Sequence, residues 1–504
     1  VGTRDAMPRR SPLLLFLLLG STLCLCVLFS WASDPSLSAV RFNRKGWRYL
    51  YWVDGSAEMS MLSSILEGRD VKTHGTWQRA TSGLRHGADL KWSFSFSRLH
   101  PSRSSQLLNH FCNSEEVDHK DEMARRLQQK FGNSIPFLPA SYFLRKEMAG
   151  EDEQTKSDRQ AFLAAQLPPR SSMWIVKPAV SGRGIGISVV RTKEEVLQVV
   201  NNDRLNQTFV VQEYLERPHI LMKRKYDIRQ FVLVTSLNPL IIYINSEYYL
   251  RFSALEYSKD DLSRREIHLT NMQVQKNAKE FHSSPVKQSQ WSSREFEEYL
   301  SHTQGPEFYS TVLRPKIEEL VIKSLSVWRP EGHRPLTFEL LGFDILLDEE
   351  LNPFLIEINS NPGLHLNTEQ VKTHHRNVLE GLVSVVLDHR TDVDVTQCVH
   401  KIKLSAMDEM EGAPRESITK QIGVWQLKHC GPVHPNVPEN CQDGQAPQAG
   451  DSFYQGPAVR QSRFNVATET EEKMQALREM RELLEQRRQQ RQQQQQQQEK
   501  KTEL

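Results

Sequence analysis

The sequence has few cysteines, almost no net charge and only one long apolar segment. Six cysteines in 504 residues, with no Cys-x-x-Cys pair, exclude a disulfide-built scaffold and give no sign of a zinc site. The 64 basic and 62 acidic side chains leave a formal net charge of +2, which gives no support for a nucleic-acid partner. The single apolar run excludes a multi-span membrane protein, and a hydrophobic share of 38% excludes disorder throughout. The length is sufficient for two or three subdomains with a substantial core.

The one apolar segment has the length of a membrane span. Residues 13–31 carry no charge, the uncharged stretch extends over 11–33, and Arg9 and Arg10 precede it. We expect residues 11–33 to form a signal-anchor or a signal peptide. The final residues read Lys-Thr-Glu-Leu and are similar to the KDEL type of retrieval signal. Together these features predict a membrane-associated protein of the endoplasmic reticulum with a single N-terminal anchor.

Composition divides the rest of the chain into four parts. Residues 46–172 predict an N-terminal subdomain, and 173–389 predict an α+β core because strand-like runs such as WIVKPA alternate with helical pieces. Residues 390–465 are rich in Pro, Gly and polar side chains, which predicts a poorly ordered region. Residues 466–504 are rich in Gln, Arg and Glu, with apolar residues at helical spacing, and predict a solvated helical or coiled tail.

Two acidic residues and an amide give the sharpest chemical signal. Asp344 lies in one strand-like run, and Glu357 and Asn359 lie in the next, beyond the short turn EELN. Residues two apart on a strand point to one face, and Asp344 on the neighbouring strand can face them. Oxygen ligands of this kind suit Mg²⁺ that bridges ATP phosphates, whereas a solvent-facing polar strand is the alternative.

A lysine beside a glycine-rich turn points to phosphate binding. Lys177 ends the hydrophobic run WIVKPA, and the turn SGRGIGI follows over 181–187. Glycines let backbone N–H groups approach phosphate oxygens closely. The lysine precedes the glycines, so this is not a Walker A motif, and a glycine-rich turn alone is as compatible with a structural role.

Further polar residues follow the next strand-like runs. The extended backbone of Gln212–Leu215 can hydrogen-bond a planar adenine edge, and Asp227 can serve a ribose or a cation. The cations expected to converge on the acidic face are Lys177, Arg229, Arg251 and Lys276. Single charged residues at strand ends are mostly surface residues, so it is this convergence that favours a ligand with several phosphates.

These motifs, taken in order, resemble the tubulin tyrosine ligase-like family. The residues that carry the resemblance read WIVKPA, SGRGIGI, VVQEYL, KYDIR, YLRFS, HLTN, GFDILLD and FLIEINSNPGL, and the similarity covers about Asn109–Leu387. It implies an ATP-grasp type core preceded by a smaller N-terminal α/β subdomain. It also implies an ATP-dependent carboxylate–amine ligase that uses Mg²⁺ and attaches an amino acid to a protein.

The resemblance implies roles for individual residues. Those implied at the ATP site are Lys120, Lys177, Arg183, Gly184, Gln212, Glu213, Tyr214, Leu215, Lys225, Tyr226, Asp227, Thr270 and Asn271. Those implied to bind the amino acid or the acceptor are Arg183, Arg251 and Lys276. The implied catalytic cations are Arg229 and Arg251, and the implied Mg²⁺ ligands are Asp344, Glu357 and Asn359. Glu213 stands where many members of the family carry lysine.

The chemistry implied by the resemblance needs no side-chain nucleophile. ATP converts a carboxylate, which is a poor electrophile, into an acyl phosphate that an amine then attacks. Glutamate is the donor that the broader family implies, with acidic tails of tubulin as acceptor. A glycine ligase remains open because the segment Trp291–Phe296 and the run DIRQF are similar to the glycine-adding branch. A non-catalytic scaffold that binds tubulin or a partner is a third reading, against which the intact metal set argues.

The expected location conflicts with the implied acceptor. The arginines before the apolar segment favour a cytosolic N-terminus and a core in the lumen, whereas tubulin lies in the cytosol. A cytosolic-facing core is therefore the alternative. The chain has one usable N-glycosylation sequon, Asn206-Gln207-Thr208. In the lumen, Cys112, Cys398, Cys430 and Cys441 could form disulfides.

Overall fold

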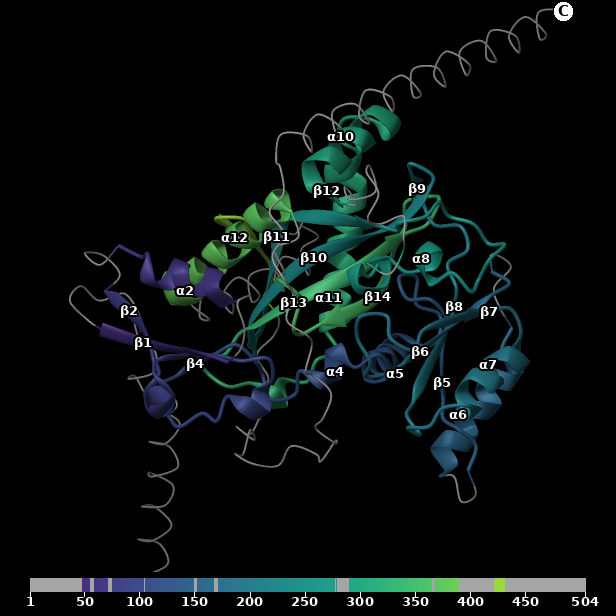
Figure 1. Cartoon of the computed structure of the whole chain (residues 1–504), viewed down its shortest axis with the longest axis horizontal. Helices are drawn as coiled ribbons and strands as arrows, with labels where there is room; N and C mark the ends of the chain where they lie inside the picture. Colours follow the sequence, from purple (N-terminus) through teal and green to yellow (C-terminus); the bar gives the residue numbers. More distant parts are fainter. Residues whose placement is uncertain are drawn as a thin grey trace, which may run out of the picture.

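The computed structural model is shown in Figure 1. It describes residues 48–54, 59–70, 75–103, 105–148, 152–166, 171–276, 278, 290–364, 368–388 and 421–430. Helices and strands are mixed throughout these residues, which confirms the predicted α+β class. The expected signal or anchor at 11–33 and the tail at 466–504 lie outside the described residues. No helix among the described residues combines the length and the apolar character that a bilayer span requires.

The first sheet is parallel, with strand order β2-β1-β3-β4. Its strands are β1 (Arg48–Val53), β2 (Thr76–Arg79), β3 (Leu90–Trp92) and β4 (Leu107–Leu108). Alternation of buried Tyr49, Tyr51 and Val53 along β1 gives this sheet its apolar face. Helix α2 (Ser60–Glu67) packs on α12 (Glu369–Val383), so the sheet joins the same core as the C-terminal helix.

The second sheet is antiparallel, with strand order β5-β8-β6-β7. Its strands are β5 (Ser141–Leu144), β6 (Trp174–Pro178), β7 (Ser188–Val190) and β8 (Phe209–Glu213). Helices α6 (Glu153–Ala164) and α7 (Lys193–Asn201) contribute Phe162, Val196 and Val200 to the core on one face of this sheet. Strand β5 and helix α6 thus lie with β6 to β8, although the composition placed them in the N-terminal subdomain.

The third sheet is the largest, and its main path runs β14-β13-β10-β11-β16-β15. Its strands on this path are β10 (Arg224–Leu237), β11 (Leu240–Phe252), β13 (Glu339–Leu347), β14 (Pro353–Asn359), β15 (Gln421–Ile422) and β16 (Trp425–Cys430). Two short strands add to it: β9 (Ile220–Leu221) pairs with β10, and β12 (Gln290–Ser292) pairs with β11. All of these pairings are antiparallel.

The two faces of the large sheet have different coverings. One face packs against α5 (Lys120–Phe131), α10 (Ser293–Gln304) and α11 (Arg314–Leu325), which share a single hydrophobic core with it. The other face is covered by α12 and the first sheet over part of its length. Beyond that covering the same face carries charged side chains, and these form the candidate site described below. The shorter helices are α4 (Glu115–Asp118), α8 (Arg265–His268) and α9 (Met272–Gln275).

Residues 421–430 correct the expectation of poor order across 390–465. They form β15 and β16, and β16 pairs with β11 of the large sheet. The reason is local: Trp425 and Leu427 are buried, whereas Gln426 and Lys428, which follow them in turn, are partly exposed. This alternation is that of a strand with one buried face, and it was hidden by the polar composition around it.

Candidate active site

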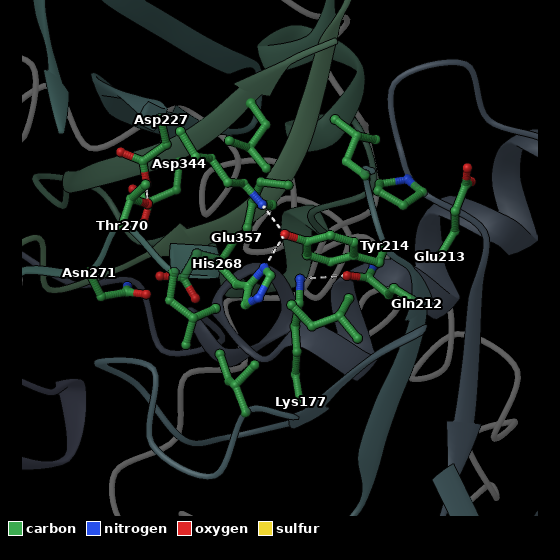
Figure 2. Close-up of a pocket in the computed structure, with 18 residues that line it drawn as sticks. Lys177, Gln212, Glu213, Tyr214, Asp227, His268, Thr270, Asn271, Asp344 and Glu357 are labelled. Carbon is green, nitrogen blue, oxygen red and sulfur yellow. Dashed lines mark hydrogen bonds between the residues drawn. The ribbon is translucent and has the colours of Figure 1, made fainter. Parts of the chain in front are cut away.

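A cavity lies between the second sheet and the large sheet, and Figure 2 shows its lining. The predicted site residues that line it are Lys177, Gln212, Glu213, Tyr214, Leu215, Lys225, Asp227, Thr270, Asn271, Asp344 and Glu357. They come from β6, β8, β10, β13, β14 and the segment between α8 and α9. Side chains from positions 177 to 357 therefore meet in one place, as the sequence pattern predicted.

Part of the wall is apolar, and these residues were not predicted from the sequence. Ile175 and Ile187 line the cavity from the second sheet, and Leu346 and Ile356 line it from the large sheet. An apolar wall on both sides suits a planar base ring, which gains by leaving water. Alternation could have identified two of the four: Ile175 precedes Lys177 by two residues, and Leu346 follows Asp344 by two.

A β-bulge explains why Ile356 was missed. Asp344 pairs with Glu357, whereas the next residue Ile345 pairs with Leu355, so Ile356 is an extra residue in β14. An extra residue shifts the strict alternation of side chains along a strand. Ile356 and its neighbour Glu357 therefore both line the cavity. The predicted facing of Asp344 and Glu357 across two adjacent strands is confirmed.

Lys177 is held by a buried amide. Its Nζ donates to Gln212 Oε1 at 2.6 Å, and Gln212 Nε2 donates to Ser141 Oγ at 2.7 Å. Lys177 and Gln212 are both almost fully buried. The Gln212 side chain is thus committed to fixing the lysine, which points into the cavity (Figure 2). An adenine ring would accordingly meet the backbone of this strand rather than the amide of Gln212.

Lys225 belongs to a second chain of hydrogen bonds. Its Nζ donates to the Tyr214 hydroxyl at 3.2 Å, and that hydroxyl lies 2.9 Å from His268 Nδ1. His268 Nε2 lies 2.9 Å from the carbonyl oxygen of Asp261, which can only accept. The proton of the neutral imidazole is therefore assigned to Nε2, so Nδ1 accepts from the tyrosine. Burial lowers the pKa of His268, in agreement with the neutral ring. His268 was not predicted from the sequence.

The two lysines lose part of their basicity in the protein without nucleotide. Burial lowers the pKa of Lys177 to about 8 and that of Lys225 to about 7, where the charge of Lys177 also contributes. A phosphate placed beside them favours the protonated form and raises both pKa values. Nucleotide binding at pH 8 should therefore take up protons, and affinity should fall as the pH rises from 7 to 9.

Calorimetry in buffers of different ionisation enthalpy measures this uptake directly. We expect about one proton per ATP at pH 8, and an uptake near zero at pH 6, where both lysines are already charged. A Lys177→Arg variant should take up less, because a guanidinium remains charged at pH 8. Binding enthalpies that are identical in all buffers at pH 8 would contradict these pKa values.

The acidic face holds a buried network of ion pairs. Arg229 Nε donates to Asp344 Oδ1 at 2.7 Å, and Arg251 Nη2 lies 2.7 Å from Asp344 Oδ2. Arg251 also forms a bidentate pair with Asp227, in which Nε donates to Oδ1 at 2.7 Å and Nη2 donates to Oδ2 at 2.5 Å. Thr270 donates its hydroxyl to Asp227 at 2.6 Å. Burial alone would raise the pKa of Asp344, but the two guanidinium groups hold it well below its usual range.

Lys120 links the acidic face to the glycine-rich turn. Its Nζ lies 3.3 Å from Glu357 Oε2 and donates to the Ser181 carbonyl at 3.0 Å. Gly184 has a φ of 73°, and a Cβ built there would lie 2.9 Å from Val274 Cγ2. Only glycine fits this close approach. The turn is thus tied at one end to a predicted metal ligand and packed at the other against α9.

The family follows from comparison with known proteins. The model of the tubulin-tyrosine ligase family matches residues 98–394, which is more than half of the chain. The chain belongs to the tubulin-tyrosine ligase family. The resemblance seen in the motifs is thereby confirmed, and the arrangement of the sheets around the cavity is that of an ATP-grasp-like domain in this family.

Proteins similar to this chain are named either as glycine ligases or as glutamate ligases. The chain is 37% identical to tubulin glycylase 3A of Drosophila melanogaster over 226 residues, which are 44% of this chain and 23% of that protein. It is 32% identical to the tubulin monoglutamylase TTLL4 of Mus musculus over 313 residues, 58% of this chain and 24% of that protein. It is 35% identical to the protein monoglycylase TTLL8 of Homo sapiens over 229 residues, 44% and 27% respectively. The chain thus spans only about a quarter of the length of these relatives.

The predicted Mg²⁺ ligands have the donor types that a magnesium site requires. Among the described residues, no three His, Cys, Asp or Glu side chains lie close enough together to bind a metal ion by themselves. Magnesium needs only one or two carboxylates when substrate phosphates complete its shell, and Asp344 and Glu357 supply them. Asn359 Nδ2 donates to the Gly342 carbonyl at 3.2 Å, which leaves Oδ1 as its ligand atom. The residues therefore fit the ion, as hard oxygen donors on paired strands.

Two predicted residues turn their side chains away from the cavity. Tyr226 lies between Lys225 and Asp227 on β10, so its ring enters the core on the opposite face, where its hydroxyl lies 2.9 Å from His219 Nδ1. The Glu213 carboxylate points away from the other labelled groups in Figure 2, and its charge acts on Tyr142 on the helix-covered face of the second sheet. Glu213 thus borders the cavity without turning its carboxylate into it, and Tyr226 does not line the cavity. The carboxylate that Glu213 has in place of the expected lysine therefore lies outside the cavity.

The other predicted residues do not line the cavity: Lys120, Gly184 and Asn359, described above, and four further cations. Arg183 and Lys276 are exposed, on the glycine-rich turn and just after α9. Arg229 and Arg251 lie behind the wall and hold its carboxylates. The roles of these four cations toward the amino acid, the acceptor and the phosphoryl group stay predictions.

Proposed function

We propose that this chain is an ATP-dependent ligase that joins an amino acid to a protein acceptor through an acyl phosphate. One observation carries the proposal. Buried Lys177 and Lys225 and the paired carboxylates Asp344 and Glu357 line the same cavity, together with apolar side chains from both sheets. A nucleotide triphosphate has an apolar base, an anionic chain that lysines bind, and a metal ion that carboxylates bind. Membership of the tubulin-tyrosine ligase family supports the same reading.

The reaction consists of two displacements. In the first, a carboxylate oxygen attacks the γ-phosphorus of ATP, the bond to the β,γ-bridging oxygen breaks, and ADP leaves. In the second, an amine nitrogen attacks the acyl carbon, inorganic phosphate leaves, and the nitrogen loses a proton. A bound Mg²⁺ would neutralise charge on the β- and γ-phosphates. Lys177, fixed by Gln212, would hold phosphate oxygens without reorganisation, which is the main source of such electrostatic catalysis.

The side chains around the acidic face suit the first displacement. Arg251 and Arg229 keep Asp344 ionised even though it is buried. The ionised carboxylate of Asp344 is therefore oriented to bind a metal ion. The guanidinium groups of Arg229 and Arg251 would also place positive charge near the carboxylate of the substrate. The apolar side chains of Leu346 and Ile356 line the same cavity and would remove the base of the nucleotide from water.

Glutamate is the donor we propose first, and glycine is the second candidate. The preference for glutamate rests on the family resemblance, and TTLL4 is named a monoglutamylase. One structural observation favours glycine. Residues 291–296, which are similar to the glycine-adding branch, begin in β12, and Gln290 of that strand pairs with Arg251. The segment therefore borders the arginine predicted to bind the amino acid. Relatives named glycylases agree with this second candidate.

The acceptor we propose is an acidic segment of a protein, with tubulin suggested by the names of the relatives. A scaffold without catalysis is the competing function. Each predicted metal ligand is present, and the buried lysines that a mere binding surface would not need are retained. These features support an enzyme.

The test uses the full chain with ATP, Mg²⁺, an acidic-tail peptide and either labelled glutamate or labelled glycine. We expect ATP-dependent incorporation of glutamate. Incorporation of glycine alone would reverse the order of the two donors but keep the ligase. Failure of both donors on tubulin and on acidic peptides, with the protein shown to be folded by thermal melting, would contradict the ligase and favour the scaffold.

A further inference from the structure

The sequon at residues 206–208 lies in an ordered loop on the outside of the second sheet. The loop joins α7 to β8 and is held by Asp203, whose carboxylate accepts from the Gln207 backbone N–H at 3.0 Å and from its side chain at 3.1 Å. Asn206 is exposed and has a φ of 50°, a conformation that asparagine tolerates better than most residues. Its side-chain amide is thus presented to solvent by a fixed turn.

The surroundings of Asn206 can accommodate a large sugar. Leu205, next to it, is 76% exposed, more than any other large hydrophobic side chain among the described residues. This exposure shows that the tip of the loop projects into solvent, where a sugar on the neighbouring side chain meets no other part of the protein surface at Leu205. The loop precedes β8, whereas Gln212 and Tyr214, which line the cavity, lie at and just beyond the far end of that strand. A glycan on Asn206 therefore leaves the adenine end of the cavity open.

A second, independent observation concerns the cysteines. Cys112, just before α4, and Cys430, at the end of β16, are both disulfide-bonded in the structure. Both lie in the ligase core, since Cys430 pairs with Ile241 of β11 and Cys112 follows buried Phe111. Disulfides persist in oxidising compartments and are rare in the cytosol. The core thus carries two features that are typical of proteins of the secretory pathway, half-cystines and an exposed sequon.

We propose that Asn206 is an N-glycosylation site and that the ligase core folds in the lumen of the secretory pathway. In the transfer, a bond forms between Asn206 Nδ2 and C1 of the first N-acetylglucosamine of a lipid-linked oligosaccharide. The bond from C1 to the lipid pyrophosphate breaks, the pyrophosphate leaves with the lipid, and the amide nitrogen loses one proton. Thr208 supplies the hydroxyl that the sequon requires.

This placement bears on the acceptor. A core in the lumen does not meet cytosolic tubulin, so an acidic segment of a secretory protein becomes the acceptor. That consequence rests on the proposed ligase function, whereas the glycan itself does not. A glycan found on an inactive protein, or an active protein without one, would separate the two proposals.

The test is a gel-mobility assay on the full chain expressed in animal cells, with and without peptide-N-glycosidase F, which releases every type of N-glycan made by these cells. We expect the wild-type band to shift on digestion and the Asn206→Gln band not to shift. Two controls share the loop: Thr208→Ser keeps the sequon and the hydroxyl that accepts from Arg145, and Asn202→Gln alters an exposed asparagine outside any sequon. Both should shift like the wild type.

Protease protection adds a readout that does not depend on the loop. In intact microsomes an added protease should leave the core uncut, and the core should be cut once detergent is present. A wild-type band unaffected by the glycosidase would overturn the glycosylation site. A core digested without detergent would overturn the lumenal placement and keep cytosolic tubulin as the proposed acceptor.

Discussion

Glu357→Gln should abolish ATP-dependent ligation while leaving the fold intact. Glu357 lines the cavity opposite Asp344 and contacts Lys120, so the amide keeps the shape of the side chain but removes a negative charge from the predicted Mg²⁺ site. A metal contributes several kcal/mol to stabilising the transferring phosphoryl group, so loss of a carboxylate ligand should lower kcat/KM by roughly a hundredfold or more. Initial rates with Mg²⁺ as the only divalent cation measure this effect.

Glu350→Gln is the matched control for this variant. Glu350 lies in the exposed turn between β13 and β14, seven residues before Glu357. The variant therefore replaces a carboxylate by an amide outside the cavity. It should ligate at the wild-type rate. Thermal melting should show both variants folded. Ligation by Glu357→Gln at the wild-type rate would contradict the assignment of this carboxylate to the metal.

Arg251→Ala should destabilise the protein strongly as well as inactivate it. Arg251 is buried and shares its guanidinium between Asp227 and Asp344. Removal leaves two buried carboxylates with Arg229 as the remaining guanidinium in their network, and loss of one partner from a buried ion pair costs about 3–5 kcal/mol. Urea unfolding of the ligand-free protein measures the change in the free energy of unfolding.

An exposed ion pair provides the comparison for this loss of stability. Arg217 lies 2.5 Å from Glu349, but their side chains are 55% and 43% exposed. Arg217→Ala should therefore change stability by about 1 kcal/mol or less. If Arg251→Ala were no more destabilising than Arg217→Ala, the buried network would not be a structural support of the acidic face.

Local spacing was enough to predict the centre of the site. Glu357 and Asn359 are two apart on one strand, Asp344 faces them from a strand joined by a short turn, and this geometry depends on neighbours in sequence. The same rule, applied along β10, would have removed Tyr226, because it lies between two residues that face the cavity. Ile356 could not be assigned from alternation, since the bulge depends on pairing with β13.

Features that depend on distant segments were not accessible from the sequence. His268 lines the cavity beside Tyr214, which lies 54 residues earlier in the chain and contacts it. Arg251 was expected to meet a substrate carboxylate, yet its protein partners are Asp227 on the neighbouring strand and Asp344, 93 residues later in the chain. Strand β16 joins the large sheet from a region whose composition predicts poor order. Pairing across the fold decides each of these placements, and composition and periodicity do not report it.

The most direct test of the ligase mechanism follows carboxylate oxygen. The full chain is incubated with ATP, Mg²⁺, an acidic peptide and an amino acid donor whose carboxylates, like those of the peptide, are labelled with ¹⁸O. Mass spectrometry then reads the peptide and the phosphate released. An acyl phosphate predicts one ¹⁸O atom in each inorganic phosphate, with one ADP formed for each residue added. Product formed with unlabelled phosphate, or with AMP in place of ADP, would contradict the account.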